Sequence, residues 1–313
     1  MNETKILLLC SSRFALPVMR TLLFGKCLTG VVIPEHCTDF IQEVNQLLLS
    51  SATPVMTVDK TNLADVLTDA VTRYRIDCCI MATFSFKIPA GVYHLPPKGF
   101  FNFHPGPLPQ YRGMDPIFQQ IKNREKQVGV TLHLVDDHFD TGPVVMTEMI
   151  PLPVDDTYGI VTTKLAEVAA KQMGILLQII GFGGLVPSKK QDESKAVYYK
   201  KQDAADISIN WQTMDADTIV ALSNASNPWN KGAVTKINNT IIRLLEVEKV
   251  PQSDEVVQLP GTILAFENKT MIVATLNNEK VIIRIACMEE GFLTADRISK
   301  SGIRAGDKFE NCL

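Results

Sequence analysis

The sequence contains no uninterrupted run of about 18 apolar residues, the length that a membrane-spanning helix needs. It also lacks a basic segment followed by a long apolar stretch near its start, where Met1-Asn-Glu-Thr-Lys5 leads directly into the short run Ile6-Leu-Leu-Leu-Cys10. These two absences argue against a membrane protein and against a secretory signal. We therefore expect a cytoplasmic protein with no membrane partner.

No C-x-x-C pair occurs among the seven cysteines, so the sequence supports neither a zinc ribbon nor a redox motif. Because the cysteines are scattered, we expect most of them to be small buried side chains in a reducing compartment. An excess of positive charge is also absent, since 31 Lys and Arg stand against 34 Asp and Glu. This net charge of −3 argues against a general nucleic-acid binder.

Apolar runs alternate with amphipathic segments in the first part of the chain. The pattern predicts strands at residues 5–10, 28–33, 54–58 and 77–84, and helices at residues 15–25, 40–51 and 62–74. Continuous apolar strands separated by helices are typical of a mostly parallel sheet that is covered on both faces. The sequence therefore predicts an α/β fold whose N-terminal domain is Rossmann-like.

The last part of the chain has a different pattern. Residues 185–206 are polar and rich in lysine, as expected of a linker. From Gly232 onward, short strands recur, and the pairs Asn238-Asn239 and Asn277-Asn278 suit hairpin turns. This spacing predicts a smaller C-terminal β-barrel domain of OB-like type. We expect an N-terminal domain over residues 1–186, a linker over residues 187–205 and the barrel domain over residues 206–313.

Three polar side chains lie near the predicted strand ends, where α/β sheets usually have their active sites. Asn102 and His104 are two residues apart at the end of an apolar strand, so they share one face. Asp140 lies before Thr-Gly, after a second pair of predicted strands. An amide can donate to an oxyanion, an imidazole can take and return a proton, and a carboxylate can orient the imidazole. We expect the three to converge on one cleft.

Other histidines lie nearby. His133 alternates with apolar residues inside a predicted strand, and we interpret it as structural. His138 lies in an Asp-rich loop, where either a turn or a binding role remains open. A metal site built from His104, His133 and His138 would have no recognised ligand spacing, so we predict no metal.

The motifs Asn102–Gly113, "NFHPGPLPQYRG", and Gly129–Val145, "GVTLHLVDDHFDTGPVV", resemble the signature of the formyltetrahydrofolate-dependent formyltransferases. In that family the signature holds an Asn-x-His, a proline-bearing loop ending in Tyr-Arg-Gly, and a later Asp-x-Gly. The segment over residues 209–238 is similar to the start of the C-terminal domain of methionyl-tRNA formyltransferase. The resemblance covers nearly the whole chain.

The resemblance implies that the chain moves a formyl group from 10-formyltetrahydrofolate to a primary amine. Asn102 and a protonated His104 would stabilise the developing oxyanion, and Asp140 would hold His104. It implies folate-binding residues on two loops: Phe84, Ser85, Phe86, Ile88, Asp136, Asp137 and His138. We expect the acceptor to meet Ser11, Ser12, Arg13, Arg112 and Trp229, although the first loop could equally be a plain turn and Trp229 could pack between domains.

Two departures from the family pattern concern the acceptor. Many relatives have His-x-Ser-Leu-Leu-Pro where this chain has His104-Pro-Gly-Pro-Leu-Pro109, which lacks the hydroxyl. Methionyl-tRNA formyltransferases carry a basic insertion that grips the tRNA, whereas this chain has no Lys or Arg between Lys26 and Lys60. We therefore rank a small or carrier-linked amine first, such as an amino sugar nucleotide or an aminoacyl group.

Formylation of methionyl-tRNA is the second interpretation, and tRNA is possible but disfavoured as a partner. Hydrolysis of formyltetrahydrofolate is the third, and a folate-binding scaffold without turnover is the fourth. The sequence leaves the identity of the amine, the pathway and the oligomeric state open.

Overall fold

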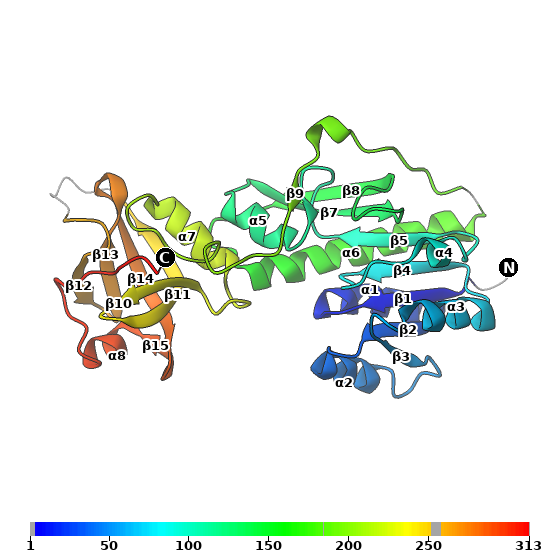
Figure 1. The fold of residues 1–313 in the computed structure, drawn as a ribbon, viewed down its shortest axis with the longest axis horizontal. Helices are drawn as coiled ribbons and strands as arrows, with labels where there is room; N and C mark the ends of the chain where they lie inside the picture. The colour runs from blue at the N-terminus through cyan, green and yellow to red at the C-terminus, as the bar shows by residue number, and fades with distance from the viewer. Residues whose placement is uncertain (1–3, 184, 252–257, 313) are drawn as a thin grey trace. The chain divides into compact units, whose positions relative to one another are not determined.

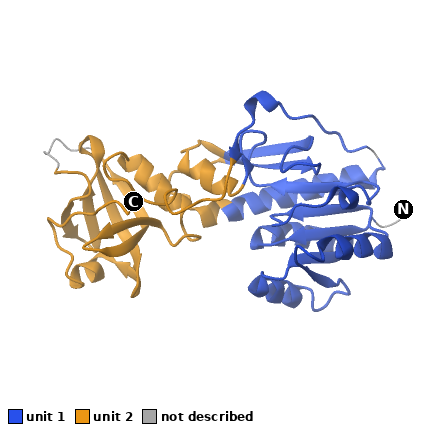
Figure 2. Cartoon of the chain, viewed as in Figure 1, with its two compact units in different colours: residues 1–113, 128–150, 162–198 blue, residues 114–127, 151–161, 199–313 orange. Residues whose placement is uncertain are grey.

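The computed structural model describes residues 4–183, 185–251 and 258–312. Figure 1 shows its helices and strands, and Figure 2 its two compact units. Unit 1 comprises residues 1–113, 128–150 and 162–198, and unit 2 comprises residues 114–127, 151–161 and 199–313. The chain therefore passes between the units several times, and the boundaries at residues 186 and 206 stay a prediction.

Unit 1 is built on a seven-stranded sheet with the order β3-β2-β1-β4-β5-β7-β8. The first five strands in this order are parallel, and β5 and β7 run antiparallel. The strands are β1 (Ile6–Cys10), β2 (Leu28–Pro34), β3 (Val55–Val58), β4 (Cys78–Ala82), β5 (Phe100–His104), β7 (Gln127–Leu134) and β8 (Val144–Pro151). The short strands β6 (Arg112–Gly113) and β9 (Tyr198–Tyr199) form a separate two-stranded sheet.

The central strands β1 and β4 are buried along their whole length, which explains their continuous apolar sequences. Leu7 and Leu9 of β1 and Cys79 and Met81 of β4 belong to one core cluster. Helices α3 (Leu63–Tyr74) and α4 (Ala90–Tyr93) contribute apolar side chains to that same cluster. One face of the sheet is thus sealed from water around its centre.

The other helices of the first 200 residues are α1 (Leu16–Phe24), α2 (Thr38–Leu47), α5 (Pro116–Lys122) and α6 (Tyr158–Gly181), with 3-10 turns at Arg13–Ala15 and Glu193–Lys195. Only three residues, 35–37, separate β2 from α2. This short connection leaves no room for an inserted loop at that point.

Unit 2 contains a six-stranded antiparallel sheet with the order β10-β11-β14-β13-β12, in which β15 also pairs with β14. Inside it, the buried rings of Trp211 and Phe309 stack with their centres 5.3 Å apart. Helix α7 (Ala216–Ala225) begins at Asp215, whose carboxylate accepts the Thr218 N–H at 2.8 Å. The remaining elements are β10 (Ala233–Ile237), β11 (Thr240–Val250), β12 (Ile263–Glu267), β13 (Thr270–Ala274), a 3-10 turn at Leu276–Asn278, β14 (Lys280–Met288), β15 (Gly291–Thr294) and α8 (Ala295–Lys300).

The predicted fold class is confirmed: a mostly parallel α/β unit is joined to a smaller unit built on an antiparallel sheet. Among the described residues, no helix combines the length and the apolar character needed to cross a bilayer. The cytoplasmic location stays a prediction.

Candidate active site

Strand β5 carries two of the three predicted catalytic side chains. Asn102 and His104 alternate with the buried residues Phe101 and Phe103, so the two polar side chains lie on the same face of the sheet. In the neighbouring antiparallel strand β7, His133 is directly opposite Asn102. Directly opposed residues place their side chains next to each other, so this register adds a second imidazole to the face.

Asp140 lies in the loop between β7 and β8, and its backbone has φ = +60°, a conformation uncommon for any residue except glycine. Its Oδ1 atom lies 3.5 Å from His104 Nδ1 and 3.7 Å from His133 Nε2. Its Oδ2 atom accepts the Gly113 N–H at 2.9 Å. Two of the predicted residues are therefore in direct contact.

His133 connects Asn102 to this pair. The Asn102 Nδ2 and His133 Nε2 atoms are 3.1 Å apart, and His133 Nδ1 is 2.8 Å from the Leu134 carbonyl oxygen. These partners assign the proton to Nδ1, which donates to Leu134, and leave Nε2 to accept from the Asn102 amide. The Asn102 Nδ2 atom carries two hydrogens. One is donated to His133, so the second N–H remains for a substrate. His133 is thus more than a core residue, because it orients the amide.

The charges at this site differ from those of free side chains. Burial works against ionisation of Asp140, but attraction to His104 and His133 in their protonated forms, together with the Gly113 N–H, outweighs it and holds the pKa of the carboxyl well below its usual range. Burial lowers the pKa of His104, while Asp140 and the Tyr111 carbonyl oppose this shift and His133 adds to it. At neutral pH the site therefore holds a carboxylate and a neutral imidazole.

The contacts of His104 show where its proton sits. Its Nε2 atom is 2.6 Å from the Tyr111 carbonyl oxygen, which can only accept, so Nε2 carries the hydrogen. Its Nδ1 atom then faces Asp140 without a proton at rest. We expected a protonated His104 from the sequence, but the buried ring is neutral until a proton arrives. A proton taken up at Nδ1 would be stabilised by Asp140.

The comparisons with known proteins agree with this geometry. The family model described as Formyl transferase matches residues 43–176, and that of the Formyl transferase, C-terminal domain, matches residues 201–295. Methionyl-tRNA formyltransferase of Halothermothrix orenii is 30% identical over 253 residues, which cover 79% of this chain and 77% of that protein. The chain belongs to the formyltransferase family.

Three further proteins are similar to this chain. Methionyl-tRNA formyltransferase of Dictyoglomus thermophilum is 34% identical over 204 residues, so this chain spans 64% of its length. The structure of WlaRD, a sugar 3N-formyl transferase, matches with a TM-score of 0.67 at 16% identity and covers 90% of this chain and 98% of that chain. HypX from Aquifex aeolicus in complex with tetrahydrofolic acid matches with a TM-score of 0.64 at 20% identity; it covers 95% of this chain, which spans 47% of HypX.

These matches confirm two predictions from the sequence: the family and the enzyme class, which is that of folate-dependent formyltransferases. The likeness to the two solved structures, at these low identities, shows the fold alone. The acceptor is a finer question, because the related sequences are named for methionyl-tRNA and WlaRD for a sugar.

The folate-binding residues expected in a formyltransferase lie on two loops of unit 1. Phe84 and Phe86 are half-buried, pack against the core cluster and meet edge to face with ring centres 5.7 Å apart. Ile88 is buried in the cluster itself. The backbone N–H of Ser85 is already used, since it donates to Ser11 Oγ at 3.1 Å.

The second expected folate loop is held by its own acidic residues. Asp136 Oδ1 accepts from the His138 backbone N–H and the Thr141 hydroxyl, at 3.2 and 2.5 Å. Asp137 Oδ1 accepts from the Tyr93 hydroxyl at 2.7 Å. Both carboxylates thus support the loop that carries Asp140, and any contact with folate remains a prediction.

The expected acceptor residues differ in their availability. Ser12 Oγ and Thr83 Oγ1 are 2.7 Å apart, so the loops after β1 and β4 are linked by hydroxyls. Arg13 is exposed and pairs with Glu43 at 2.8 Å, an exposed ion pair of small energetic weight that a stronger anion could replace. Trp229 belongs to unit 2, and 71% of it is exposed.

Arg112 is not available to a substrate, contrary to our expectation. It is fully buried, and its five N–H groups donate to Gln191, Glu193 and Tyr198. The sequence analysis missed Gln191 and Glu193, because both lie in the segment that we interpreted as a linker.

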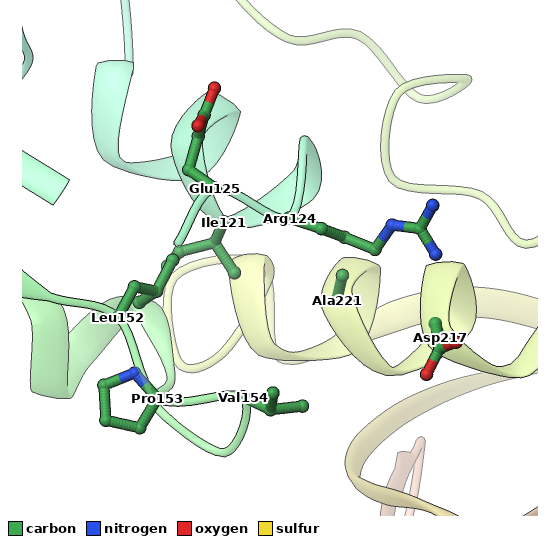
Figure 3. A pocket seen from close by; sticks show the side chains of 8 residues that line it. All are labelled: Ile121, Arg124, Glu125, Leu152, Pro153, Val154, Asp217 and Ala221. Carbon is green, nitrogen blue, oxygen red and sulfur yellow. The ribbon is translucent and has the colours of Figure 1, made fainter. Parts of the chain in front are cut away.

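A cavity of about 200 Å³ lies within unit 2 and is drawn in Figure 3. Its wall combines apolar side chains with opposite charges: Ile121, Arg124, Glu125, Leu152, Pro153, Val154, Asp217 and Ala221. None of the predicted site residues lines it, so it is not the site of formyl transfer. In the described part of the chain, no group of three His, Cys, Asp or Glu side chains could hold a metal ion.

Proposed function

We propose that this formyltransferase transfers the formyl group of 10-formyltetrahydrofolate to the primary amine of a small or carrier-linked acceptor. The observation that carries the proposal is the contact of the buried His104 imidazole with the largely buried Asp140 carboxylate, beside an Asn102 amide that is oriented by His133. Such a group can stabilise an oxyanion and exchange a proton in the same place.

Bound 10-formyltetrahydrofolate supplies an electrophilic formyl carbon, whose bond to N10 breaks as a bond to the acceptor nitrogen forms. The free N–H of Asn102 is suited to donate to the formyl oxygen as negative charge develops there. His104 takes up the proton that the amine loses, at Nδ1, where Asp140 stabilises the resulting imidazolium. The His104 proton is returned when N10 leaves, so the site ends as it began.

Two loops of unit 1 have side chains suited to binding 10-formyltetrahydrofolate. The half-buried rings of Phe84 and Phe86 offer apolar surface, and the loop of Asp136, Asp137 and His138 offers polar atoms near Asp140 in the sequence. We propose these residues, with Ser85 and Ile88, as those that hold the folate.

A small or carrier-linked amine is supported as the acceptor by the absence of cations around the connection between β2 and α2. No Lys or Arg occurs between Lys26 and Lys60, and residues 35–37 form the whole connection. From residue 204 onward, 11 Lys and Arg stand against 14 Asp and Glu. A surface that binds tRNA gains affinity by neutralising several phosphates, and this composition does not favour one. We propose Ser11, Ser12, Arg13 and Trp229 as acceptor residues.

The test is to incubate the chain with 10-formyltetrahydrofolate and a panel of amines, and to follow each amine by mass spectrometry. We expect a gain of one formyl group on an amino sugar nucleotide or an aminoacyl compound. Formate release without any acceptor would support the hydrolase instead. Folate binding with neither product would leave only a scaffold role and would contradict the proposal.

Formylation of methionyl-tRNA is a second candidate, favoured by the names of the related sequences. We expect initiator tRNA to be retained weakly in a filter-binding assay at both 50 and 200 mM salt. A protein that contacts 6–10 phosphates loses about 10³–10⁵ in affinity over this range. Tight binding that falls this steeply would reverse the order of the two candidates.

A further inference from the structure

Arg112 is a fully buried cation that fastens a distant segment to unit 1. Its Nε and Nη2 atoms donate to Gln191 Oε1 at 3.1 and 2.8 Å, and its Nη1 and Nη2 atoms donate to Glu193 at 2.8 and 2.6 Å. Nη1 also donates to the Tyr198 hydroxyl at 2.8 Å, and the guanidinium lies 5.2 Å from the centre of the Tyr198 ring. A buried guanidinium without such partners would be strongly unfavourable, so the segment is held firmly.

Gln191 passes this connection on to the catalytic loop. Its Nε2 atom donates to the carbonyl oxygens of Asp140 and Gly142, at 2.7 and 2.8 Å. Because Oε1 accepts twice from Arg112, every hydrogen-bonding position of the Gln191 amide is occupied. No other residue type of this length offers two acceptor and two donor positions in this arrangement.

Asp140 is consequently fixed through both its main chain and its side chain. Gln191 fixes its main chain, which has the uncommon φ of +60°, and the N–H of Gly113 fixes its carboxylate at 2.9 Å. Gly113 follows Arg112, whose own N–H donates to the Val197 carbonyl at 3.0 Å. Arg112 therefore supports both contacts of Asp140: the one with Gln191 through its side chain, and the one with Gly113 through its main chain.

We propose that Gln191 and Glu193, with Arg112, are positioning residues that fix Asp140 against His104. None of the three touches a reacting atom. Glu193 balances the charge of Arg112. Gln191 is hydrogen-bonded to both Arg112 and the Asp140 main chain, so it keeps the two at a fixed distance from each other. The lysine-rich segment over residues 185–206 therefore contributes to catalysis by positioning Asp140. This inference rests on the proposed function.

The test compares Gln191→Met with Tyr198→Phe. Both variants remove hydrogen bonds from the buried Arg112, but only Gln191→Met also releases the Asp140 and Gly142 carbonyls. The charged and titratable groups facing His104 are Asp140 and His133, and Asp140 raises the pKa of His104. We therefore expect NMR titration of the full chain to give a lower pKa for His104 in Gln191→Met, and an unchanged one in Tyr198→Phe. The His104 signal is assigned by its loss in His104→Gln.

The matching kinetic result is a fall in kcat of about 10- to 100-fold in Gln191→Met, with the KM for 10-formyltetrahydrofolate within about threefold of the parent. Ser194→Ala, on the same segment but bonded only to Asp192 in the described contacts, is expected to keep the parent kcat. If Gln191→Met fails to fold, Gln191→Glu keeps the Arg112 contacts while turning an oxygen toward the two carbonyls, and the same loss of kcat is expected.

An unchanged His104 pKa in Gln191→Met would overturn the positioning role, as would a kcat equal to that of Tyr198→Phe. The titration needs no substrate. If it shifts as expected while no amine is formylated, the proposed function fails and the positioning role stands.

Discussion

The variant His104→Ala is expected to lower kcat for formyl transfer by at least about 100-fold, because it removes the imidazole whose Nδ1 faces Asp140 and takes up the amine proton in the proposed mechanism. The variant Asp140→Asn is expected to lose as much, since the imidazolium formed during the reaction would then be buried without a counter-charge. Formyl transfer to the best amine of the panel, followed by mass spectrometry, measures both effects.

Folate binding separates catalysis from folding in this experiment. We expect both variants to bind 10-formyltetrahydrofolate with nearly the parent affinity, as measured by calorimetry, because neither residue is among the proposed folate contacts. The exposed His94, which is none of the proposed site residues, provides a matched His→Ala control. Full activity in His104→Ala, with folate bound, would remove this residue from the mechanism.

The parallel sheet could be read from the sequence because its central strands are apolar on both faces. The runs at residues 5–10 and 77–84 have no alternation, and β1 and β4 are indeed buried throughout. Asn102 and His104 were found for a local reason too, as two polar residues on one face at the end of a strand. Asp140 was singled out by its turn signal and by the family resemblance.

The role of His133 could not be seen in the same way. Within its own strand it alternates with apolar residues, which is the pattern of a structural residue. Only the register between β5 and β7 places it opposite Asn102, and register depends on the pairing of two distant segments. A histidine on the same face as two catalytic candidates, in a neighbouring predicted strand, was the available signal.

The support of Asp140 by Gln191 was hidden for a related reason. The residues of the pair Arg112 and Gln191 are 79 positions apart. A polar, lysine-rich segment has the same sequence pattern whether it is fully solvated or held by hydrogen bonds between three of its side chains and Arg112. The burial of Arg112, which decides between these cases, is a property of the folded chain.

The largest structural effect is expected from Gly142→Ala. A Cβ atom at position 142 would lie 1.7 Å from the Leu134 carbonyl oxygen and 2.7 Å from its carbonyl carbon. Leu134 cannot yield, because its N–H donates to the Pro143 carbonyl at 2.9 Å and its carbonyl accepts from His133. The loop between β7 and β8 must therefore open, with loss of about 2–4 kcal/mol of stability.

The opening of this loop also moves Asp140, two residues away, so activity is expected to fall by about 100-fold or more even where the variant folds. Gly174→Ala is the matched control: it lies inside helix α6 with no atom within 4 Å of the added Cβ, and it is expected to stabilise unit 1 by about 0.5–1 kcal/mol. Thermal unfolding and formyl transfer, measured on both variants, give the comparison. A Gly142→Ala protein with the melting temperature and activity of the parent would show that the close approach of Leu134 does not set the position of Asp140.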